Sequence, residues 1–148
     1  MAPPVSLHLL GPSDAPLLAG ARIFDNPVDP VQAAAFLADP GHLIVVARQE
    51  ETLVGFVSGA ILRHPDKPPA LFILELGVEE PARRQGIARA LMAEIRALGR
   101  KRGCTASWVA TEGDNDVARA TYRHLGGDET VGIAMYEWAE ATDPQTGG

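Results

Sequence analysis

The stretch Leu76-Gly77-Val78-Glu79-Glu80-Pro81-Ala82-Arg83-Arg84-Gln85-Gly86-Ile87-Ala88 joins two contrasting patterns of apolar residues. Before it, residues Ala70 to Val78 are almost continuously apolar, which is typical of a central strand with both faces buried. After it, a helix is predicted to end at Gly103, because the basic run Arg100-Lys101-Arg102 opposes the negative end of a helix dipole. The apolar residues of this helix recur at helical spacing and form one stripe: Ile87, Leu91, Ile95 and Leu98, with Ala88 and Met92 beside them.

Strands and helices are predicted on both sides of this stretch. His42 to Arg48 and Thr52 to Leu62 are two strands whose polar connection, Gln49-Glu50-Glu51, favours an antiparallel hairpin. Alternating strands and helices predict a mixed sheet with helices on both faces, which is an α/β fold. The turn Gly11-Pro12-Ser13-Asp14 can cap a helix that runs to about Phe24. The other expected elements are a strand over Val5 to Leu10, a helix over Val31 to Ala38, a strand over Cys104 to Ala110, a helix over Asp116 to Leu125 and an alternating strand over Thr130 to Trp138.

Length and composition favour a single domain over residues 1–148, in which Ala139 to Gly148 lack any pattern and are expected to form a flexible tail. The net charge of −6 disfavours nucleic-acid binding and favours cationic partners. The longest apolar runs fall well short of the roughly 20 residues that span a bilayer, and the N-terminus lacks the features of a secretory signal. We therefore expect a cytoplasmic protein that binds neither nucleic acid nor a membrane.

Cysteine and histidine give no sign of a metal site. The single cysteine, Cys104, is expected to be a small buried thiol. The histidines match none of the spacings of a zinc site, and we expect no metal. Trp108 and Trp138, both on predicted strands, are expected to be core or dimer-contact residues. The four histidines of the sequence, which do not match a zinc site, are His8, His42, His64 and His124.

The start of the long helix is a candidate phosphate site. A helix N-terminus offers unpaired amides and a positive dipole end, and Gly86 and Ala88 leave these amides open to a pyrophosphate. Arg83 and Arg84 would add positive charge. The alternative is that Gly86 makes a tight turn beside solvated arginines. The segment contains neither a Walker loop nor a three-glycine dinucleotide fingerprint, so a nucleotide-bearing ligand with another geometry fits better.

These motifs resemble the GNAT acetyltransferases. That superfamily has an Arg/Gln-x-x-Gly-x-Gly/Ala signature after an "LxV" strand end, which Leu76-Gly77-Val78 and Arg83 to Ala88 match in order and spacing. A second landmark of the family is matched later in the chain by Asn115, Ala118, Tyr122 and Leu125-Gly126-Gly127. The resemblance covers roughly Leu43 to Trp138. It implies a GNAT-like, mostly antiparallel central sheet, an acetyl-CoA-dependent N-acetyltransferase and a homodimer.

The resemblance also implies where acetyl-CoA binds. In the superfamily the pantetheine arm pairs with the splayed strand end that corresponds here to Leu76 to Val78, and the acceptor amine attacks the thioester directly. The implied cosubstrate contacts are Leu76, Val78, Arg83, Arg84, Gln85, Gly86, Ile87, Ala88, Arg89, Asn115 and Tyr122.

Two residues suit the proton transfers of that reaction. Glu75, expected to be buried beside the thioester, would have a raised pKa and could accept the proton of the amine. Tyr122 could donate its phenolic proton to the leaving sulfur. Two alternatives remain open: Glu75 is a structural carboxylate paired with an arginine, and Tyr122 is a core aromatic with a satisfied hydroxyl.

Four further features can be compared with the branches of the family: the acidic residue before the "LxV", the helix start, an acidic cluster before the tyrosine helix and an aromatic-acidic pair on the last predicted strand. Here they are Glu75, Arg83 to Ala88, Glu112 with Asp114 and Asp116, and Tyr136-Glu137. In these features the chain most resembles the aminoglycoside 3-N-acetyltransferases, which suggests a small cationic amine as acceptor and a role in antibiotic resistance. Glu75 departs from that branch, which usually has aspartate there, and its longer side chain would shift the base by about one carbon–carbon bond. Asp114 and Asp116 are equally plausible as helix N-caps. Other readings are an enzyme for another small amine or a peptide amine, and a non-catalytic CoA-binding regulatory module. The expected substrate-binding carboxylates are Glu75, Glu112, Asp114, Asp116 and Glu137.

Overall fold

A computed structural model describes residues 2–142, which form two compact units, residues 2–110 and 111–142. Of the predicted tail, residues 139–142 contain neither helix nor strand, and residues 143–148 lie outside the described residues. Across residues 2–142, every helix is too short or too polar to traverse a bilayer.

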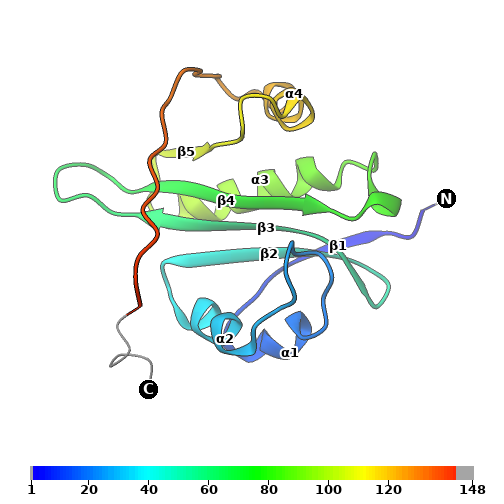
Figure 1. The fold of residues 1–148 in the computed structure, drawn as a ribbon. Coiled ribbons are helices and arrows are strands. Elements are labelled where there is room, and N and C mark those ends of the chain that lie inside the picture. Colours follow the sequence, from blue (N-terminus) through cyan, green and yellow to red (C-terminus); the bar gives the residue numbers. More distant parts are fainter. Residues whose placement is uncertain (1, 143–148) are drawn as a thin grey trace. The chain divides into compact units, whose positions relative to one another are not determined.

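The first unit is built on a five-stranded sheet with the order β1-β2-β3-β4-β5 (Figure 1). Each of the first four strands pairs antiparallel with its neighbour, and β5 pairs parallel with β4 after the crossover through helix α3. This confirms the mixed, mostly antiparallel α/β fold. The strands are β1 (Val5–Leu9), β2 (His42–Gln49), β3 (Thr52–Leu62), β4 (Ala70–Val78) and β5 (Ala106–Val109), and α3 covers Ile87–Lys101.

Helices cover both faces of this sheet. On one face, α3 packs against β2, β3 and β4 through the predicted stripe, in which Leu91 and Ile95 are fully buried. Gly59 makes room for this contact, since a Cβ there would lie 2.9 Å from Leu71 Cδ1 and 3.1 Å from Ile95 Cδ1. The other face packs against α1 (Ala15–Leu18) and α2 (Pro30–Ala38) in a core cluster of Leu10, Leu18, Leu37, Ile44, Val46 and Phe56.

Two of the helices begin as their sequences predict. Asp29 caps α2, its Oδ1 accepting from the amides of Val31 and Gln32 at 2.9 and 3.3 Å. Gly86 precedes α3 with φ 77°, a left-handed conformation that glycine adopts without strain. After α3, Gly103 has φ 88°, as expected for a helix-ending glycine.

The helix predicted from Asp14 to about Phe24 is wrong beyond Leu18. A 3-10 turn, η1 (Pro12–Asp14), leads into α1, which ends because Ala19 is extended and Gly20 is left-handed with φ 76°. The residues that follow nevertheless serve the core, since the ring of Phe24 lies 4.5 Å from that of Phe56. The apolar residues of this segment therefore pack against the core, partly buried, without forming a helix.

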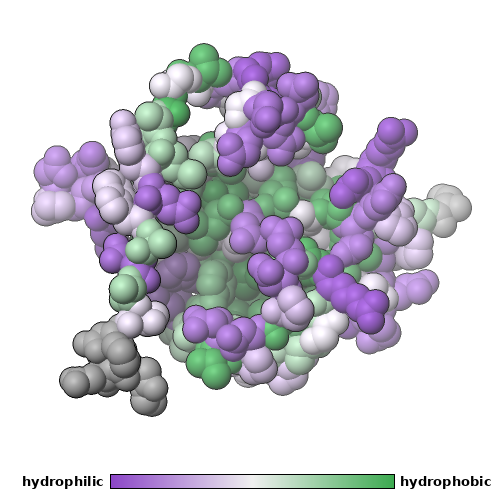
Figure 2. All heavy atoms as spheres, in the orientation of Figure 1, coloured by the Kyte–Doolittle hydropathy of each residue, from purple (hydrophilic) through white to green (hydrophobic). Residues whose placement is uncertain are grey.

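The second unit contains α4 (Asp116–His124), whose end is followed by Gly126 with φ 88°. Hydrophilic residues cover most of this helix, and none of its residues is buried (Figure 2).

A second 3-10 turn, η2 (Glu80–Ala82), belongs to the first unit and precedes α3.

The strand predicted over Thr130 to Trp138 is wrong. Residues 128–142 pair with no other strand among the described residues, and Gly132 has φ 82°, which breaks an extended run. Alternation specifies which side chains share a face, but a strand also needs a partner for its backbone groups. The apolar side chains of the segment are 69–81% exposed: Val131, Ile133, Met135, Tyr136 and Trp138.

Neither tryptophan is a core residue. Trp108 on β5 is 47% exposed and stacks on Phe72 of β4, with ring centroids 4.1 Å apart. Trp138 is 74% exposed, and its ring lies 6.4 Å from that of Tyr136. Both rings stand on surfaces where a partner could cover them.

Candidate active site

β4 and β5 run together over only four residue pairs. Their parallel pairing begins at Ala70 and Ala106 and stops at Ile73 and Val109, where β5 ends. From Leu74 to Val78, β4 therefore has no strand partner on this edge within residues 2–142. Backbone donors and acceptors left open in this way can pair with an extended ligand that carries amide groups.

A β-bulge interrupts β4 just before this free edge. Ser58 of β3 pairs with Glu75 and Gly59 pairs with Ile73, so Leu74 is the extra residue. Ile73 faces α3, and the extra residue moves Glu75 onto the opposite face of the sheet, beside the buried Ser58.

Glu75 is consequently exposed, not buried as its strand predicted. The burial that was expected to suit Glu75 to accept a proton is therefore absent. The alternative also fails, because Glu75 forms no ion pair with an arginine in the described part of the chain. Its carboxylate stands at the start of the free β4 edge, where it is accessible to a cationic group.

The N-terminus of α3 has the properties of an anion cradle. Ile87 and Ala88, in the first helical turn, have amides without a protein acceptor among the hydrogen bonds of residues 2–142. A Cβ placed on Gly86 would meet no atom within 4 Å, so the space beside the amides is open. Arg84 and Gly86 are both left-handed, with φ 65° and 77°, and such turns direct successive amides toward one point. The predicted phosphate site therefore fits an anion.

The side chains around this cradle have different roles. Ile87 is buried in the core, so only its amide is available to a ligand. Arg83 was expected to reach phosphates, but its Nε donates to the carbonyl of Val78 at 3.0 Å and so braces the loop against β4. Arg84 and Arg89 are exposed on either side of the helix start and bring positive charge to it.

Gln85 makes a contact that the sequence did not predict. Its Oε1 accepts a hydrogen bond of 2.7 Å from Nε2 of Gln49, the last residue of β2. The two residues are 36 positions apart, and no local motif links them.

In the second unit, Asn115 caps α4, its Oδ1 accepting from the amide of Ala118 at 3.0 Å. Its side-chain amide group has no protein acceptor among the described residues. Tyr122, on the same helix, is half-buried, and this burial raises the pKa of its phenol above the ordinary 10. Tyr122 therefore keeps its proton at neutral pH and can serve as a donor.

The four acidic residues predicted in this unit are all exposed. Since Asn115 is the N-cap of α4, neither Asp114 nor Asp116 caps the helix, and that alternative is wrong. Asp116 is the first residue of α4, where its charge favours the helix dipole. Glu112 precedes the cap, and Glu137 lies in the segment after α4. The carboxylates are thus available to a cation.

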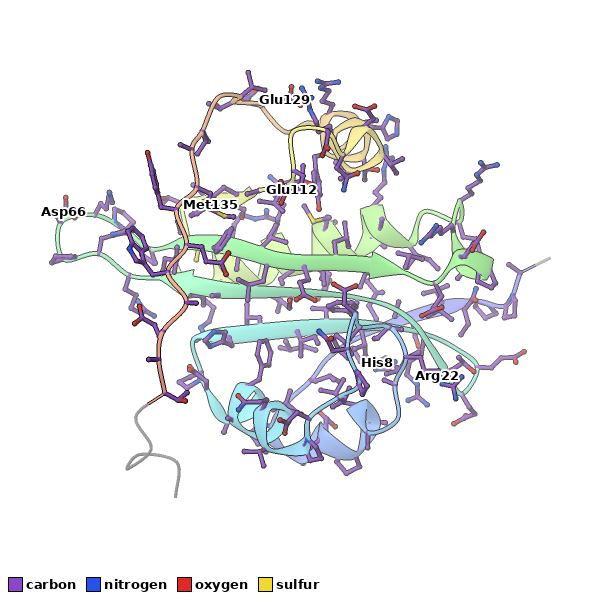
Figure 3. All side chains as sticks on the ribbon, viewed as in Figure 1. His8, Arg22, Asp66, Glu112, Glu129 and Met135 are labelled. Carbon is purple, nitrogen blue, oxygen red and sulfur yellow. The ribbon has the colours of Figure 1, made fainter. Side chains whose placement is uncertain are left out.

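An unpredicted ion-pair cluster organises α4. Arg119 and Arg123, one turn apart, both bind Oε1 of Glu129 at 2.9 and 2.7 Å, and the Glu129 side chain points toward the helix (Figure 3). Hydrogen bonds from Arg119 and then Arg123 lower the pKa of Glu129 from 4.5 to about 2. Arg119 also donates to the carbonyl of Gly113 at 2.7 Å, which ties the acidic loop to the helix. The i, i+4 spacing of two arginines was the signal available in the sequence.

The described residues hold no group of three or more His, Cys, Asp or Glu side chains that could bind a metal ion.

Several curated proteins are similar to this chain. Aminoglycoside N(6')-acetyltransferase type 1 of Salmonella typhimurium strain LT2 is 26% identical over 96 residues, which cover 62% of this chain and 66% of that protein. L-2,4-diaminobutyric acid acetyltransferase of Methylotuvimicrobium alcaliphilum is 38% identical over 74 residues, 48% of this chain and 42% of that protein. N-acetyltransferase 8B of Homo sapiens is 28% identical over 113 residues, 76% of this chain and 50% of that protein. The chain thus spans less than two thirds of the first of these relatives, at 66%, and half or less of the others.

Solved structures share the fold. An aminoglycoside acetyltransferase from an uncultured soil metagenomic sample, in complex with sisomicin, superposes with a TM-score of 0.78 at 21% identity over 91% of this chain and 97% of that chain. The aminoglycoside N-acetyltransferase AAC(6')-Iy in complex with CoA has a TM-score of 0.77 at 18% identity over 93% and 97% of the two chains. The acetyltransferase (GNAT) family model matches residues 16–126, most of the chain, and with the signature at the start of α3 this shows that the protein belongs to the acetyltransferase (GNAT) family.

Proposed function

We propose that the protein is an acetyl-CoA-dependent N-acetyltransferase. The observation that carries this proposal is the open cradle at Gly86. Within residues 2–142, the amides at the start of α3 have no acceptor, and the edge of β4 just before them has no strand partner. A pyrophosphate suits the cradle, and an extended pantetheine arm suits the edge. Membership of the GNAT family and the CoA-bound relative support the same cosubstrate.

The proposed cosubstrate contacts combine backbone and side chains. Leu76 and Val78 would offer β4 backbone groups, and the amides from Gln85 to Ala88 would bind the pyrophosphate. Acetyl-CoA supplies the acetyl group as a thioester, which the acceptor amine attacks directly. The contacts we propose are Leu76, Val78, Arg83, Arg84, Gln85, Gly86, Ile87, Ala88, Arg89, Asn115 and Tyr122.

Glu75 and Tyr122 are the proposed proton-transfer groups. The exposed carboxylate of Glu75 would accept the proton of the attacking ammonium directly or through a water molecule. Tyr122, which burial keeps protonated, would donate to the departing thiolate. Glu75→Gln removes the base with little change in size, so kcat should fall and its pH dependence should change, while the KM for acetyl-CoA stays within about twofold. An unchanged pH profile would exclude Glu75 as the base.

For the acceptor, we propose an amino group of an aminoglycoside. Exposed carboxylates at Glu75, Glu112, Asp114, Asp116 and Glu137 suit a polycationic sugar, in which each ammonium group seeks a partner. The resemblance in sequence suggests the 3-amino group, whereas the curated aminoglycoside relatives are N(6')-acetyltransferases. The similarity to diaminobutyric acid acetyltransferases makes a small diamine the second candidate.

A thiol-release assay with acetyl-CoA and a panel of acceptors tests these proposals. The panel contains aminoglycosides with and without a free 3-amino or 6'-amino group, 2,4-diaminobutyrate, polyamines and peptides. We expect turnover with aminoglycosides, and mass spectrometry of the product then identifies the acetylated nitrogen. Turnover with other amines only would refute the aminoglycoside proposal. Tight binding of acetyl-CoA with no acetylation of any amine would instead favour a regulatory CoA-binding module.

We propose that residues 1–148 act as one catalytic domain, that the protein is a cytoplasmic homodimer and that it binds neither nucleic acid nor a membrane. The exposed apolar residues between Val131 and Trp138 support a dimer, because apolar side chains of this size are favoured at subunit interfaces. Sedimentation of the wild type should give a dimer, and Met135→Ser with Trp138→Ser should shift it to a monomer.

A further inference from the structure

The end of the β2–β3 hairpin holds the loop before α3 at two points. The amide of Glu79, directly after β4, donates to the carbonyl of Val54 on β3 at 2.8 Å. Farther along the loop, Nε2 of Gln49 donates to Oε1 of Gln85 at 2.7 Å and to the carbonyl of Pro3 at 3.1 Å. Gln49 is itself fixed in the sheet, since it pairs with Val5 of β1 and with Thr52 of β3.

The loop needs such support because its backbone is unusual. Residues 83–86 belong to no helix or strand, and two of them are left-handed: Arg84, which is not a glycine, at φ 65°, and Gly86 at φ 77°. A side-chain-bearing residue in this region is strained and persists only when its surroundings hold it there. Among the described residues, the side-chain bonds that hold residues 83–86 are those of Arg83 to Val78 and of Gln85 to Gln49.

We propose that Gln49 is a positioning residue for the cosubstrate. It fixes Gln85 against the sheet, and thereby fixes the direction in which the following amides, from Gly86 to Ala88, point. A loop held in this way has its donors arranged before the ligand arrives, so less conformational freedom is lost on binding. In this role Gln49 acts through Gln85 and not by a contact of its own with the cosubstrate. The inference rests on the proposed binding of acetyl-CoA at the α3 N-terminus.

A double-mutant cycle tests the role of the Gln49–Gln85 bond. Gln49→Ala and Gln85→Ala each remove the bond and leave every backbone amide in place. We expect each variant to raise the Kd for CoA and the KM for acetyl-CoA about three- to tenfold, as the loss of one hydrogen bond predicts, with kcat changed less than about twofold. The Kd of the double variant for CoA should be no higher than that of either single variant, because both substitutions remove the same contact.

Two further variants serve as controls. Gln49→Lys keeps a donor within reach of Gln85 and Pro3, so it should restore most of the affinity. Gln32→Ala is the same substitution at an exposed position of α2, far along the chain from the loop. It should leave the Kd for CoA and the KM for acetyl-CoA unchanged. Unchanged CoA affinity in Gln49→Ala, or additive losses in the double variant, would overturn the positioning role.

Hydrogen exchange of residues 83–90 separates this inference from the proposed function. If Gln49 positions the loop, amides in this segment should exchange faster in Gln49→Ala than in the wild type, without any ligand. A wild-type protein that fails to bind CoA would refute the proposed function, while faster exchange would still support the positioning of the loop. Equal exchange rates in the two proteins would refute the positioning role of Gln49, whether or not the protein binds CoA.

Discussion

Replacing Gly86 by alanine should have two effects: a loss of folding stability from backbone strain, and a loss of affinity for acetyl-CoA. Gly86 has φ 77°, and an added Cβ would meet no protein atom within 4 Å. The substitution should therefore cost only the left-handed strain of an L-residue, about 1–2 kcal/mol. For a chain of this size, that lowers Tm by roughly 2–6 °C.

The chain provides a matched control at Gly20. It has φ 76° and also has nothing within 4 Å of an added Cβ, so Gly20→Ala should lower Tm by the same amount as Gly86→Ala. The two variants should differ in ligand binding. At Gly86 the new methyl group stands beside the amides of Ile87 and Ala88, and losing one charge-assisted hydrogen bond, about 1.5–3 kcal/mol, weakens binding roughly 10- to 100-fold.

Calorimetry with acetyl-CoA and thermal unfolding, run on both variants, provide the test. We expect Gly20→Ala to bind acetyl-CoA within about twofold of the wild type and Gly86→Ala to lose at least tenfold. Equal affinities of the two variants for acetyl-CoA, whether high or low, would refute the proposal that acetyl-CoA binds at the start of α3.

Three other predictions follow from the described contacts. Tyr122→Phe should lower kcat roughly 100-fold while leaving the KM for acetyl-CoA nearly unchanged in steady-state assays; an unaltered kcat would remove Tyr122 from the chemistry. The pKa of Glu129 is lowered from 4.5 to about 2, so its ionised form stabilises the fold fully above pH 4.5, and this contribution is lost as pH falls toward 2. Glu129→Gln should therefore lower the urea midpoint of unfolding at pH 7, and the difference from wild type should shrink between pH 4.5 and 2; a difference that stays constant would contradict this linkage. Gly59→Ala should cost about 1–3 kcal/mol in chemical unfolding, because its Cβ would lie 2.9 Å from Leu71 Cδ1, whereas Gly113→Ala, with open space around it, should be close to neutral.

The strongest periodic patterns predicted the structure well. The strands over Thr52–Leu62 and Ala70–Val78 have the predicted bounds, and the stripe of α3 packs on the sheet as its spacing indicated. These elements were predictable because each kind of burial has its own sequence pattern. A strand buried on both faces is a continuous apolar run, and a helix buried on one face has apolar residues at helical spacing. The start of α3 after Gly86 was predictable because it depends on the local conformation of that glycine.

Other features depend on residues that are distant in sequence, and these were missed. The bulge at Leu74 moves Glu75 to the opposite face, and no pattern in the strand records an extra residue. The bond between Gln49 and Gln85 joins residues brought together only by the folded chain. The segment from Thr130 to Trp138 shows the converse, since it has the alternation of a strand but no partner strand within residues 2–142.

The short pairing of β4 with β5 has a consequence for the protein's behaviour in solution. From Leu74 to Val78 this edge of β4 has no strand partner within residues 2–142, and an edge of this kind can template another strand and promote aggregation. A bound pantetheine arm would cover this edge, and a ligand at 100 times its Kd stabilises the folded state by about 2.7 kcal/mol. The soluble yield of the protein would then follow the supply of its own cosubstrate, and purification with added CoA should preserve material that is otherwise lost to precipitation.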